Sequence, residues 1–397
     1  MHLQQTARTA PKEVDRPLAS GRVLHVLEAV GGGTARHVVD IVRHTDGFEH
    51  HVAVPSRRVG GLSDAHAADR MRAAGATVHI VEMRRAPITL RNTSALATLV
   101  RLIRTVDVDI VHGHSSIGGV LARLAAARTR RPCIYTPNGV ATGPVALAVE
   151  RALARLTTHH VAVSVSEAEL LRKRRIAPAS SVAVIPNGIE ADSMTSSPNA
   201  VELRALLGVP AGAPLVGSVA RLVPQKAPER FVQVAAVVGR ARPDAHFALI
   251  GDGPLAATVD RAVASSGIAE RFHRVDGIDG AEHVLDQLDV FVLTSRFEGG
   301  PYTPLEAMRA ATPVVLTDVV GNRDVVENGL SGYVVAEDDV DGMAARIVGL
   351  LDDPELRRTI GDGGRKRLMT SFTVEQMCAQ LAEVYGRLLA AREGTGG

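Results

Sequence analysis

The sequence predicts an α/β protein of two domains, each built around a parallel β-sheet, and three observations support this prediction. A chain of 397 residues is too long for one ordinary core and suits two domains of similar size. From Arg22 onward, short apolar runs rich in Val and Ile alternate with amphipathic stretches of helical period. After Pro186 a polar, Ser-rich stretch interrupts this alternation, as a domain linker does.

The strand candidates are apolar runs that end at a turn or helix signal. In the first half they are RVLHVLEAV, HHVAVP, TVHIVE, VDIVHGH, PCIYTP, HHVAVS and SVAVIP, and in the second half PLVGSVA, HFALIG, FHRVDG, DVFVLT, PVVLT and GYVV. We expect a leader over residues 1–20, domains over 21–190 and 191–370, and a helical segment over 371–397. Two such domains place a cleft between the carboxyl ends of their sheets, where open α/β sheets bind ligands.

Composition excludes several classes of protein. The 45 Lys plus Arg nearly cancel the 43 Asp plus Glu, which argues against nucleic-acid binding through many phosphate contacts. Cys133 and Cys378 are the only cysteines and form no CxxC motif, so neither a disulfide framework nor a structural zinc site is supported, and a reducing cytoplasm fits. The leader has no apolar core and no apolar run reaches about 18 residues, so we expect a poorly ordered leader, no signal peptide and no membrane span.

The segment TSRFEGGPYTPLEAM is the most informative about chemistry. Glu298 and Glu306 are separated by seven residues that include a glycine turn. We expect a strand to end at Thr294 and a helix to start near Thr303, so that unpaired backbone N–H groups at the turn suit an anionic diphosphate. Glu298 then faces the sugar. In the alternative interpretation Glu306 only complements the helix dipole and the glycines only form a turn.

Two cations occur in the segment GSVARLVPQKAPE. Arg221 follows a buried-strand pattern, and Lys226 comes five residues later in a loop before a helix. At a strand's carboxyl end both would bind a diphosphate and stabilise the charge that develops on the leaving group. The alternative is a solvated loop with a lysine at a helix start.

A glycine cluster follows the first strand in AVGGGTARHVVDIV. Gly31, Gly32 and Gly33 let the backbone approach a ligand closely before a helix opens at about Thr34. The later glycine of GxGxxG is missing, so an NAD site is disfavoured.

Polar residues also end two neighbouring strands of the first domain. His112 and His114 end VDIVHGH, and Asn138-Gly139 follows PCIYTP, so all can line one edge of the cleft. Single histidines at strand ends are more often structural than catalytic, and both interpretations stay open.

Together and in this order, these segments resemble the retaining glycosyltransferases of sequence family four, which have the GT-B fold. The shared pattern comprises the glycine-rich loop, HGHSSIGG, VSxSE, PNGI, GxxARLxxxK, GDGP and FEGGPYTPLEAM followed by TPVVLTDVVGN. The resemblance covers nearly the whole chain. It implies two Rossmann-like domains that face each other across a cleft, with the last helix crossing back to the first domain.

The resemblance also implies residue roles. Arg221 and Lys226 correspond to the pair that holds the donor diphosphate. Glu306 corresponds to the carboxylate that accepts hydrogen bonds from the ribose, and Glu298 to the residue that grips the sugar hydroxyls. The backbone loops expected around the diphosphate, sugar and base are formed by Gly32, Gly33, Gly251, Gly253, Gly299, Gly300, Pro301, Tyr302 and Thr303.

One departure from the family pattern concerns Asn138. Relatives commonly have TPHG where this chain reads TPNG, so an asparagine replaces the histidine beside the reacting sugar. Asparagine hydrogen-bonds a sugar hydroxyl but cannot act as a base. Either His112 or His114 compensates, or the missing imidazole only positioned the donor; a chain that has lost activity is the remaining alternative.

The resemblance implies transfer of a sugar, of hexosyl type, from a nucleotide diphosphate sugar to a hydroxyl acceptor, free or lipid-linked. The pathways implied are cell-envelope, exopolysaccharide or secondary-metabolite glycoside synthesis, and family frequency favours UDP. We expect front-face transfer with retention, with Glu298 as nucleophile the alternative. No Asp-x-Asp motif sits in a matching context, so we expect no metal and no other cofactor. A nucleotide-sugar epimerase, a phosphorylase and a non-catalytic nucleotide-sugar-binding subunit are the other candidates.

Basic runs at residues 172–175 and at Arg84-Arg85 lie in the first domain, which in this architecture faces the acceptor. They suggest weak peripheral contact with anionic lipid at the inner face of the membrane. We favour the alternative, in which cations at a helix end complement its dipole and the other run is a solvated loop.

Overall fold

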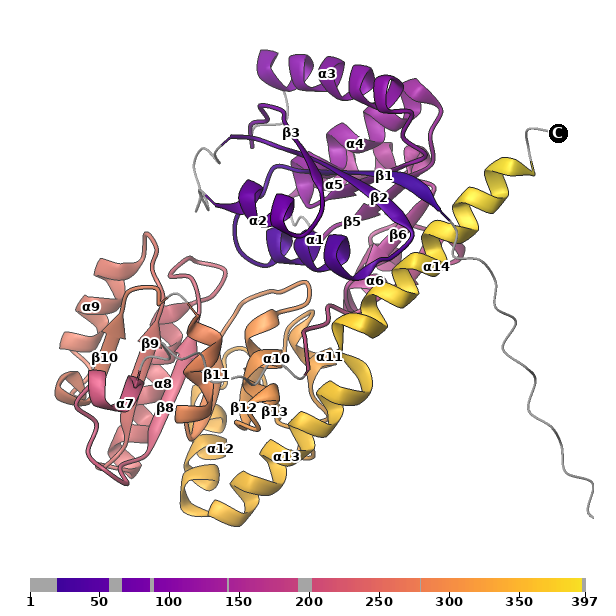
Figure 1. Ribbon diagram of the computed structural model, residues 1–397. Coiled ribbons are helices and arrows are strands. Elements are labelled where there is room, and N and C mark those ends of the chain that lie inside the picture. Colours follow the sequence, from indigo (N-terminus) through magenta and orange to yellow (C-terminus); the bar gives the residue numbers. More distant parts are fainter. Residues whose placement is uncertain are drawn as a thin grey trace, which may run out of the picture.

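The computed structural model describes residues 20–56, 66–85, 89–140, 143–191, 202–278 and 280–394. Over these residues the chain forms two α/β domains, the first lying above the second in Figure 1. Within the described residues, all strand pairs of the two sheets are parallel, which confirms the predicted fold class. The predicted leader and the polar stretch after Ala191 lie almost entirely outside the described residues.

The first sheet has the strand order β3-β2-β1-β4-β5-β6-β7. Its strands are β1 (Gly21–Leu27), β2 (Phe48–Val54), β3 (Thr77–Ile80), β4 (Ile110–His114), β5 (Cys133–Thr136), β6 (His159–Ala162) and β7 (Val182–Val184). The helices between them are α1 (Gly33–His44), α2 (Ala67–Ala73), α3 (Leu90–Val106), α4 (Ser116–Thr129), α5 (Pro144–Leu153) and α6 (Val165–Lys173).

The second sheet has the strand order β10-β9-β8-β11-β12-β13. Its strands are β8 (Leu215–Val219), β9 (His246–Ile250), β10 (Phe272–Val275), β11 (Val290–Leu293), β12 (Val314–Thr317) and β13 (Tyr333–Val335). The helices are α7 (Leu203–Leu206), α8 (Pro228–Ala241), α9 (Ala256–Ala264), α10 (Tyr302–Arg309), α11 (Asn322–Val325), α12 (Val340–Asp352), α13 (Pro354–Ser371) and α14 (Val374–Glu393).

Burial explains why these strands could be recognised as continuous apolar runs. Every residue of β4, β5, β11 and β12 is buried, because helices cover both faces of each sheet. In the register of β1 with β4, Leu27 lies beside His114, and β4 with β5 places His114 beside Thr136. These strand ends therefore share one edge of the first sheet.

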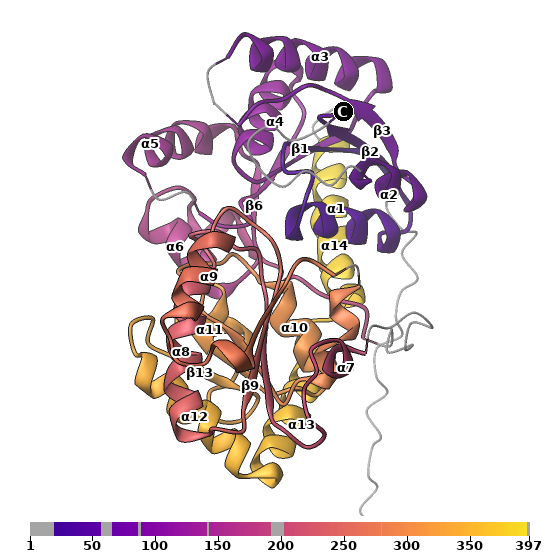
Figure 2. The ribbon, with the colours of Figure 1, turned by 90° about the vertical axis from the view of Figure 1, so that its left-hand side faces the viewer.

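Helix α14 leaves the second domain and runs along the first, as Figures 1 and 2 show. Its Met377, Leu381 and Tyr385 are buried in a core cluster with Val23 and Ile41 of the first domain. A capping box formed by Thr373 and Gln376 starts the helix.

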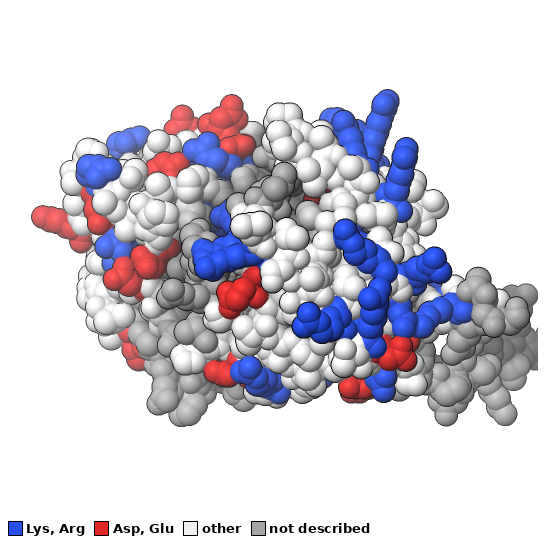
Figure 3. All heavy atoms as spheres, turned by 90° about the horizontal axis from the view of Figure 1, so that it is seen from above, with Lys and Arg blue, Asp and Glu red and all other residues white. Residues whose placement is uncertain are grey.

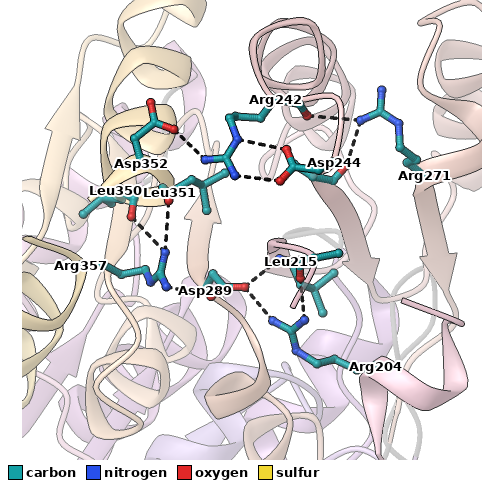
Figure 4. Close-up of polar contacts among 12 residues, drawn as sticks. Arg204, Leu215, Arg242, Asp244, Arg271, Asp289, Leu350, Leu351, Asp352 and Arg357 are labelled. Carbon is teal, nitrogen blue, oxygen red and sulfur yellow. Dashed lines mark hydrogen bonds and ion pairs between the residues drawn. The ribbon is translucent and has the colours of Figure 1, made fainter. Parts of the chain in front are cut away.

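Ion pairs fix the edge of the second sheet that lies away from the first domain (Figure 4). Asp289, just before β11, accepts from Arg204 Nη2 at 2.6 Å and from the backbone N–H of Leu215 at 2.8 Å. Arg242 pairs with Asp352 at 2.6 Å, which joins the end of α8 to the end of α12. These contacts hold the amino-terminal ends of the strands together. The carboxyl ends of the strands, which face the first domain, therefore belong to a rigid sheet.

The outer face of the first domain carries exposed arginines, among them Arg101 and Arg104 on α3. Figure 3, which views the molecule from above, shows Lys and Arg predominating on its right-hand side, whereas both signs mix on its left. In the basic run over residues 172–175, Arg172 and Lys173 form the last turn of α6, where cations complement the helix dipole. No helix in the described part of the chain is long and apolar enough to cross a membrane.

Candidate active site

Two helix N-termini meet where the sheet edges face each other. Helix α1 follows the N-cap Gly32, α10 follows the N-cap Pro301, and no side chain among the described residues caps either one. A Cβ atom on Gly33 would lie 3.2 Å from Cδ2 of Tyr302, so the glycine loop closes directly on α10. The unpaired N–H groups and positive dipole ends of both helices favour an anion such as a diphosphate at this place.

Both predicted carboxylates lie beside this meeting point, and each has a cation partner. Glu306 on α10, 6% exposed, accepts a short hydrogen bond from Arg36 of α1 in the other domain. Glu298, also 6% exposed, accepts from Lys226 Nζ at 2.5 Å and from Ser295 Oγ at 2.5 Å. The loop after β8 is thereby joined to the loop after β11.

Arg221 lies half-buried at the carboxyl end of β8, next to the GDGP loop. A Cβ atom on Gly251 would lie 2.0 Å from the carbonyl oxygen of Ala220, and one on Gly253 would lie 2.5 Å from that of Leu222. Both positions therefore require glycine because two backbones touch there. The diphosphate and base roles of these residues stay predictions.

The Asn138 turn of the first domain packs on the glycine loop of the second. Asn138 has φ 53°, a left-handed conformation that asparagine tolerates better than most residues. A Cβ atom on Gly299 would lie 2.7 Å from the nitrogen of Gly139. Asn187, in the segment that joins the domains, donates from Nδ2 to the carbonyl oxygen of Gly300 at 2.7 Å. The loop over residues 299–303 is thus held between the domains.

The two candidate histidines are fully buried. His112 has both ring nitrogens in hydrogen bonds, Nδ1 with the hydroxyl of Tyr385 and Nε2 with Oγ1 of Thr136, each at 2.8 Å. His114 bonds through Nε2 to Nδ1 of His25 at 3.0 Å. The structure therefore corrects the expectation that His112 lines the cleft: its partners place it in the packing between β4, β5 and α14.

The hydrogen bonds of His114 continue through a chain of imidazoles whose protons can be assigned. Thr45 Oγ1 donates to the carbonyl of Ile41, so it accepts from Nε2–H of His50. His50 Nδ1 then accepts from His25, and His25 Nδ1 accepts from Nε2–H of His114. Each ring is neutral. Burial lowers the pKa of these histidines well below the ordinary value, in His50 to about 4.

His25, His112 and His114 hold ligand atoms within 4.8 Å of one another, close enough for a metal ion. However, both nitrogens of His25 and of His112 already have hydrogen-bond partners. We interpret the cluster as a neutral hydrogen-bond network that fixes the end of β4. That the protein needs no metal stays a prediction.

Sequence reasoning missed Arg36 and Asn187 as site residues. Each lies in a segment whose pattern is informative, namely the glycine loop and PNGI. Their partners are distant in the sequence, 270 residues away for Arg36 and 113 for Asn187. The only available signal was a polar residue next to a glycine motif.

Two parallel-sheet domains whose strand ends face each other, with a site suited to a diphosphate between them, define the GT-B class of glycosyltransferases. Comparison with known sequences agrees in both halves of the chain. The family described as Glycosyltransferase Family 4 matches residues 31–193, and the family described as Glycosyl transferases group 1 matches residues 201–367. The chain belongs to the group 1 glycosyltransferases of family 4.

Individual relatives support this assignment. The 2-deoxystreptamine N-acetyl-D-glucosaminyltransferase of Streptomyces fradiae is 30% identical over 287 residues, 67% of this chain and 68% of that protein. The UDP-Gal:alpha-D-GlcNAc-diphosphoundecaprenol alpha-1,3-galactosyltransferase of Escherichia coli is 26% identical over 309 residues, 75% of this chain and 80% of that one. The protein is a glycosyltransferase that uses a nucleotide sugar.

Solved structures show the same fold. Anabaena HepE in complex with UDP and glucose has a TM-score of 0.80 at 20% identity, over 92% of this chain and 100% of that chain. The sucrose-phosphate synthase of Thermosynechococcus elongatus has a TM-score of 0.74 at 19% identity, over 94% and 100% of the two chains. The predicted GT-B fold is confirmed.

Proposed function

We propose that the protein is a retaining hexosyltransferase that moves a sugar from a UDP-sugar to a hydroxyl group of its acceptor. The acceptor would belong to cell-envelope, exopolysaccharide or small-molecule glycoside synthesis. One observation carries the proposal: two uncapped helix N-termini meet beside two cation–carboxylate pairs, Arg36–Glu306 and Lys226–Glu298. Cations and N–H groups suit the diphosphate, and carboxylates suit the hydroxyls of ribose and sugar.

The choice of UDP rests on relatives whose names state a nucleotide. The Escherichia coli relative is named for UDP-Gal. The HepE structures contain UDP or UDP-glucose. By contrast, a Mycolicibacterium smegmatis relative, 27% identical over 322 residues, is named as GDP-mannose-dependent. The base must therefore be measured for this chain.

Donor binding exchanges the partners of the two carboxylates. Lys226 and Arg221 turn to the diphosphate, whose two negative charges they neutralise. Glu298 is then available to accept from sugar hydroxyls, and Glu306 from ribose hydroxyls. Asn138, on the turn that packs against Gly299, hydrogen-bonds the sugar from the first domain.

In the transfer step the bond between the anomeric carbon and the diphosphate oxygen breaks, and a bond to the acceptor oxygen forms on the same face. The acceptor's proton goes to the departing phosphate oxygen. Lys226, Arg221 and the helix N-termini stabilise the charge that develops on the diphosphate without requiring a metal. With the donor bound, Glu298 accepts hydrogen bonds from Ser295 and from sugar hydroxyls, which makes it a poor nucleophile and favours front-face transfer over a covalent intermediate.

A lipid-linked acceptor and weak contact with anionic lipid stay predictions. The exposed arginines on α3 offer such a surface. Co-sedimentation with vesicles of phosphatidylglycerol at low and high salt tests the contact. Binding at low salt that high salt weakens would support this contact. Absence of binding at both salt concentrations would dismiss it.

The first test of the function is thermal shift of the purified protein with UDP, GDP, dTDP and ADP. We expect UDP to raise the melting temperature of wild type and of Arg240→Ala, an exposed control at the end of α8, but not of Arg221→Ala. A shift with another nucleotide would reassign the base, and a shift with none would contradict the proposal. Binding of UDP without turnover of any UDP-sugar would favour a non-catalytic binding subunit.

A further inference from the structure

The N-terminus of α6 holds a carboxylate that no site role explains. Glu167 is fully buried, and the described part of the chain offers it no cation. Its Oε1 accepts from the backbone N–H of Gly139 at 2.6 Å, and its Oε2 from that of Val163 at 2.9 Å. Burial raises the pKa of Glu167 to about 7, against the effect of these two hydrogen bonds. Burying a carboxylate without a cation lowers the stability of the folded protein. Glu167 must therefore provide a benefit that compensates for this loss.

That benefit is the position of the Asn138 turn. Asn138 has φ 53° and Gly139 has φ 113°, so the turn is two consecutive residues in left-handed conformations. Such a backbone persists only where its surroundings fix it. The hydrogen bond from Gly139 to Glu167 supplies one fixed point, and the packing of Gly299 on the same peptide supplies a second.

The residue before Glu167 reaches the other domain. Ser166 donates through its backbone N–H to Asp324 Oδ2 at 3.0 Å and through its hydroxyl to the same oxygen. The hydroxyl oxygen accepts from the backbone N–H of Gly321 at 2.9 Å. A Cβ atom on Gly321 would lie 2.6 Å from the carbonyl oxygen of Gly299, so this turn supports the glycine loop from behind.

The same turn also holds Glu298. The backbone N–H of Glu298 donates to the carbonyl oxygen of Val320 at 3.1 Å. Two adjacent residues of one helix turn therefore hydrogen-bond to the backbone of both site loops. Glu167 binds the N–H of Gly139 in the loop with Asn138, and Ser166 binds the N–H of Gly321 in the turn that packs on Gly299.

We propose that Glu167 and Ser166 are positioning residues of the transfer reaction, which align the Asn138 turn of the first domain with the donor loop of the second. They do not touch the substrate. The inference rests on the proposed function, because alignment matters only if a sugar reacts between these loops. A misplacement of about 1 Å at a reacting centre can cost about 100-fold in rate.

The test compares kcat and KM for the UDP-sugar in Glu167→Gln and wild type. The amide is isosteric but offers one oxygen acceptor, so one of the two N–H groups faces an NH₂ group and the turn shifts. We expect kcat to fall at least about 10-fold, with KM for the donor and the UDP thermal shift nearly unchanged. Ser166→Ala is expected to lower kcat in the same way.

The matched control is Glu150→Gln, a second buried carboxylate of the first domain. Glu150 binds Arg123 at 2.8 Å and Tyr135 at 3.1 Å and holds neither loop. We expect this change to lower the melting temperature and to leave kcat of the folded enzyme within about 2-fold.

Three results separate the outcomes. A kcat of Glu167→Gln within 2-fold of wild type, or a loss no larger than that of Glu150→Gln, would overturn the inference while the function stands. If Glu167→Gln does not fold, an unchanged kcat in Ser166→Ala would overturn it equally. If wild type itself turns over no UDP-sugar in the same assay, the proposed function fails first.

Discussion

Arg36 of helix α1 and Glu306 of helix α10 form an ion pair between the two domains. The guanidinium carbon of Arg36 also lies 4.7 Å from the ring centroid of Tyr302. Glu306 is the carboxylate that we propose to bind the donor ribose. In this conformation the ribose therefore competes with a cation of the protein itself.

We predict that Arg36→Ala destabilises the protein and increases the stabilisation by UDP. Glu306 is nearly buried and loses its cation, whereas Arg36 is about one-third exposed, so the expected loss is about 2 kcal/mol rather than the larger value of a fully buried pair. Ribose hydroxyls then satisfy the carboxylate without displacing a partner. The measurement is the melting temperature with and without UDP.

The control for this change is Arg43→Ala on the same helix. Arg43 pairs with Glu190 at 3.3 Å, and both side chains are close to half-exposed, so we expect a loss below about 0.5 kcal/mol and an unchanged UDP shift. A UDP shift in Arg36→Ala no larger than in wild type would argue against Glu306 as the ribose ligand.

A pair of glycine substitutions tests whether the two loops must touch. Gly299→Ala places a Cβ atom 2.7 Å from the backbone of Asn138 and Gly139, so the loops must separate. We expect kcat/KM to fall about 100-fold or more. Gly349→Ala, inside α12 with no atom within 4 Å of the new Cβ, should leave activity unchanged and raise stability by about 0.5–1 kcal/mol. Equal activity of both variants would show that the contact is dispensable.

The buried histidines predict loss of stability in acid. Burial lowers the pKa of His37, His50 and His160 from 6.5 to about 4. Between these values the unfolded chain binds more protons than the native one, so stability is complete above pH 6.5 and falls as the pH drops toward 4. Each histidine accounts for about 2 kcal/mol at pH 5.

The measurement is the melting temperature between pH 7.5 and 5. His160→Asn removes one titrating ring and should reduce the pH dependence of the melting temperature, whereas Gly349→Ala, which removes no titrating group, should leave it as in wild type. A pH dependence that is identical in all three proteins would contradict this account.

The fold was predictable because its strands are buried on both faces. Runs such as VDIVHGH and DVFVLT read as continuous apolar segments, and each predicted strand matches an observed one. The helix predicted to start near Thr303 begins at Tyr302, and the final helix, expected within 371–397, begins at Val374 with Thr373 as its N-cap. Local patterns decide these boundaries.

The site residues were predictable only where a single segment of the sequence shows both the reactive side chain and its place at a strand end or helix start. Arg221, Lys226, Glu298 and Glu306 stand out because each follows a strand or starts a helix. The sequence contains no sign that Lys226 pairs with Glu298 and Arg36 with Glu306, because packing of distant segments creates both contacts. The same limit explains His112: its position at a strand end suggested the cleft, whereas Tyr385 of α14 covers it.

The most direct test of the account is calorimetric titration of UDP into wild type, Lys226→Ala and Lys173→Ala. Lys226 is placed to hold the diphosphate, and Lys173 ends α6 outside the site. The account predicts that UDP binds wild type and Lys173→Ala alike, and Lys226→Ala about 10- to 100-fold more weakly, as expected for a charge-assisted contact of about 1.5–3 kcal/mol. Equal affinity of UDP for all three proteins, or no binding to wild type, would contradict a donor site at this place between the domains.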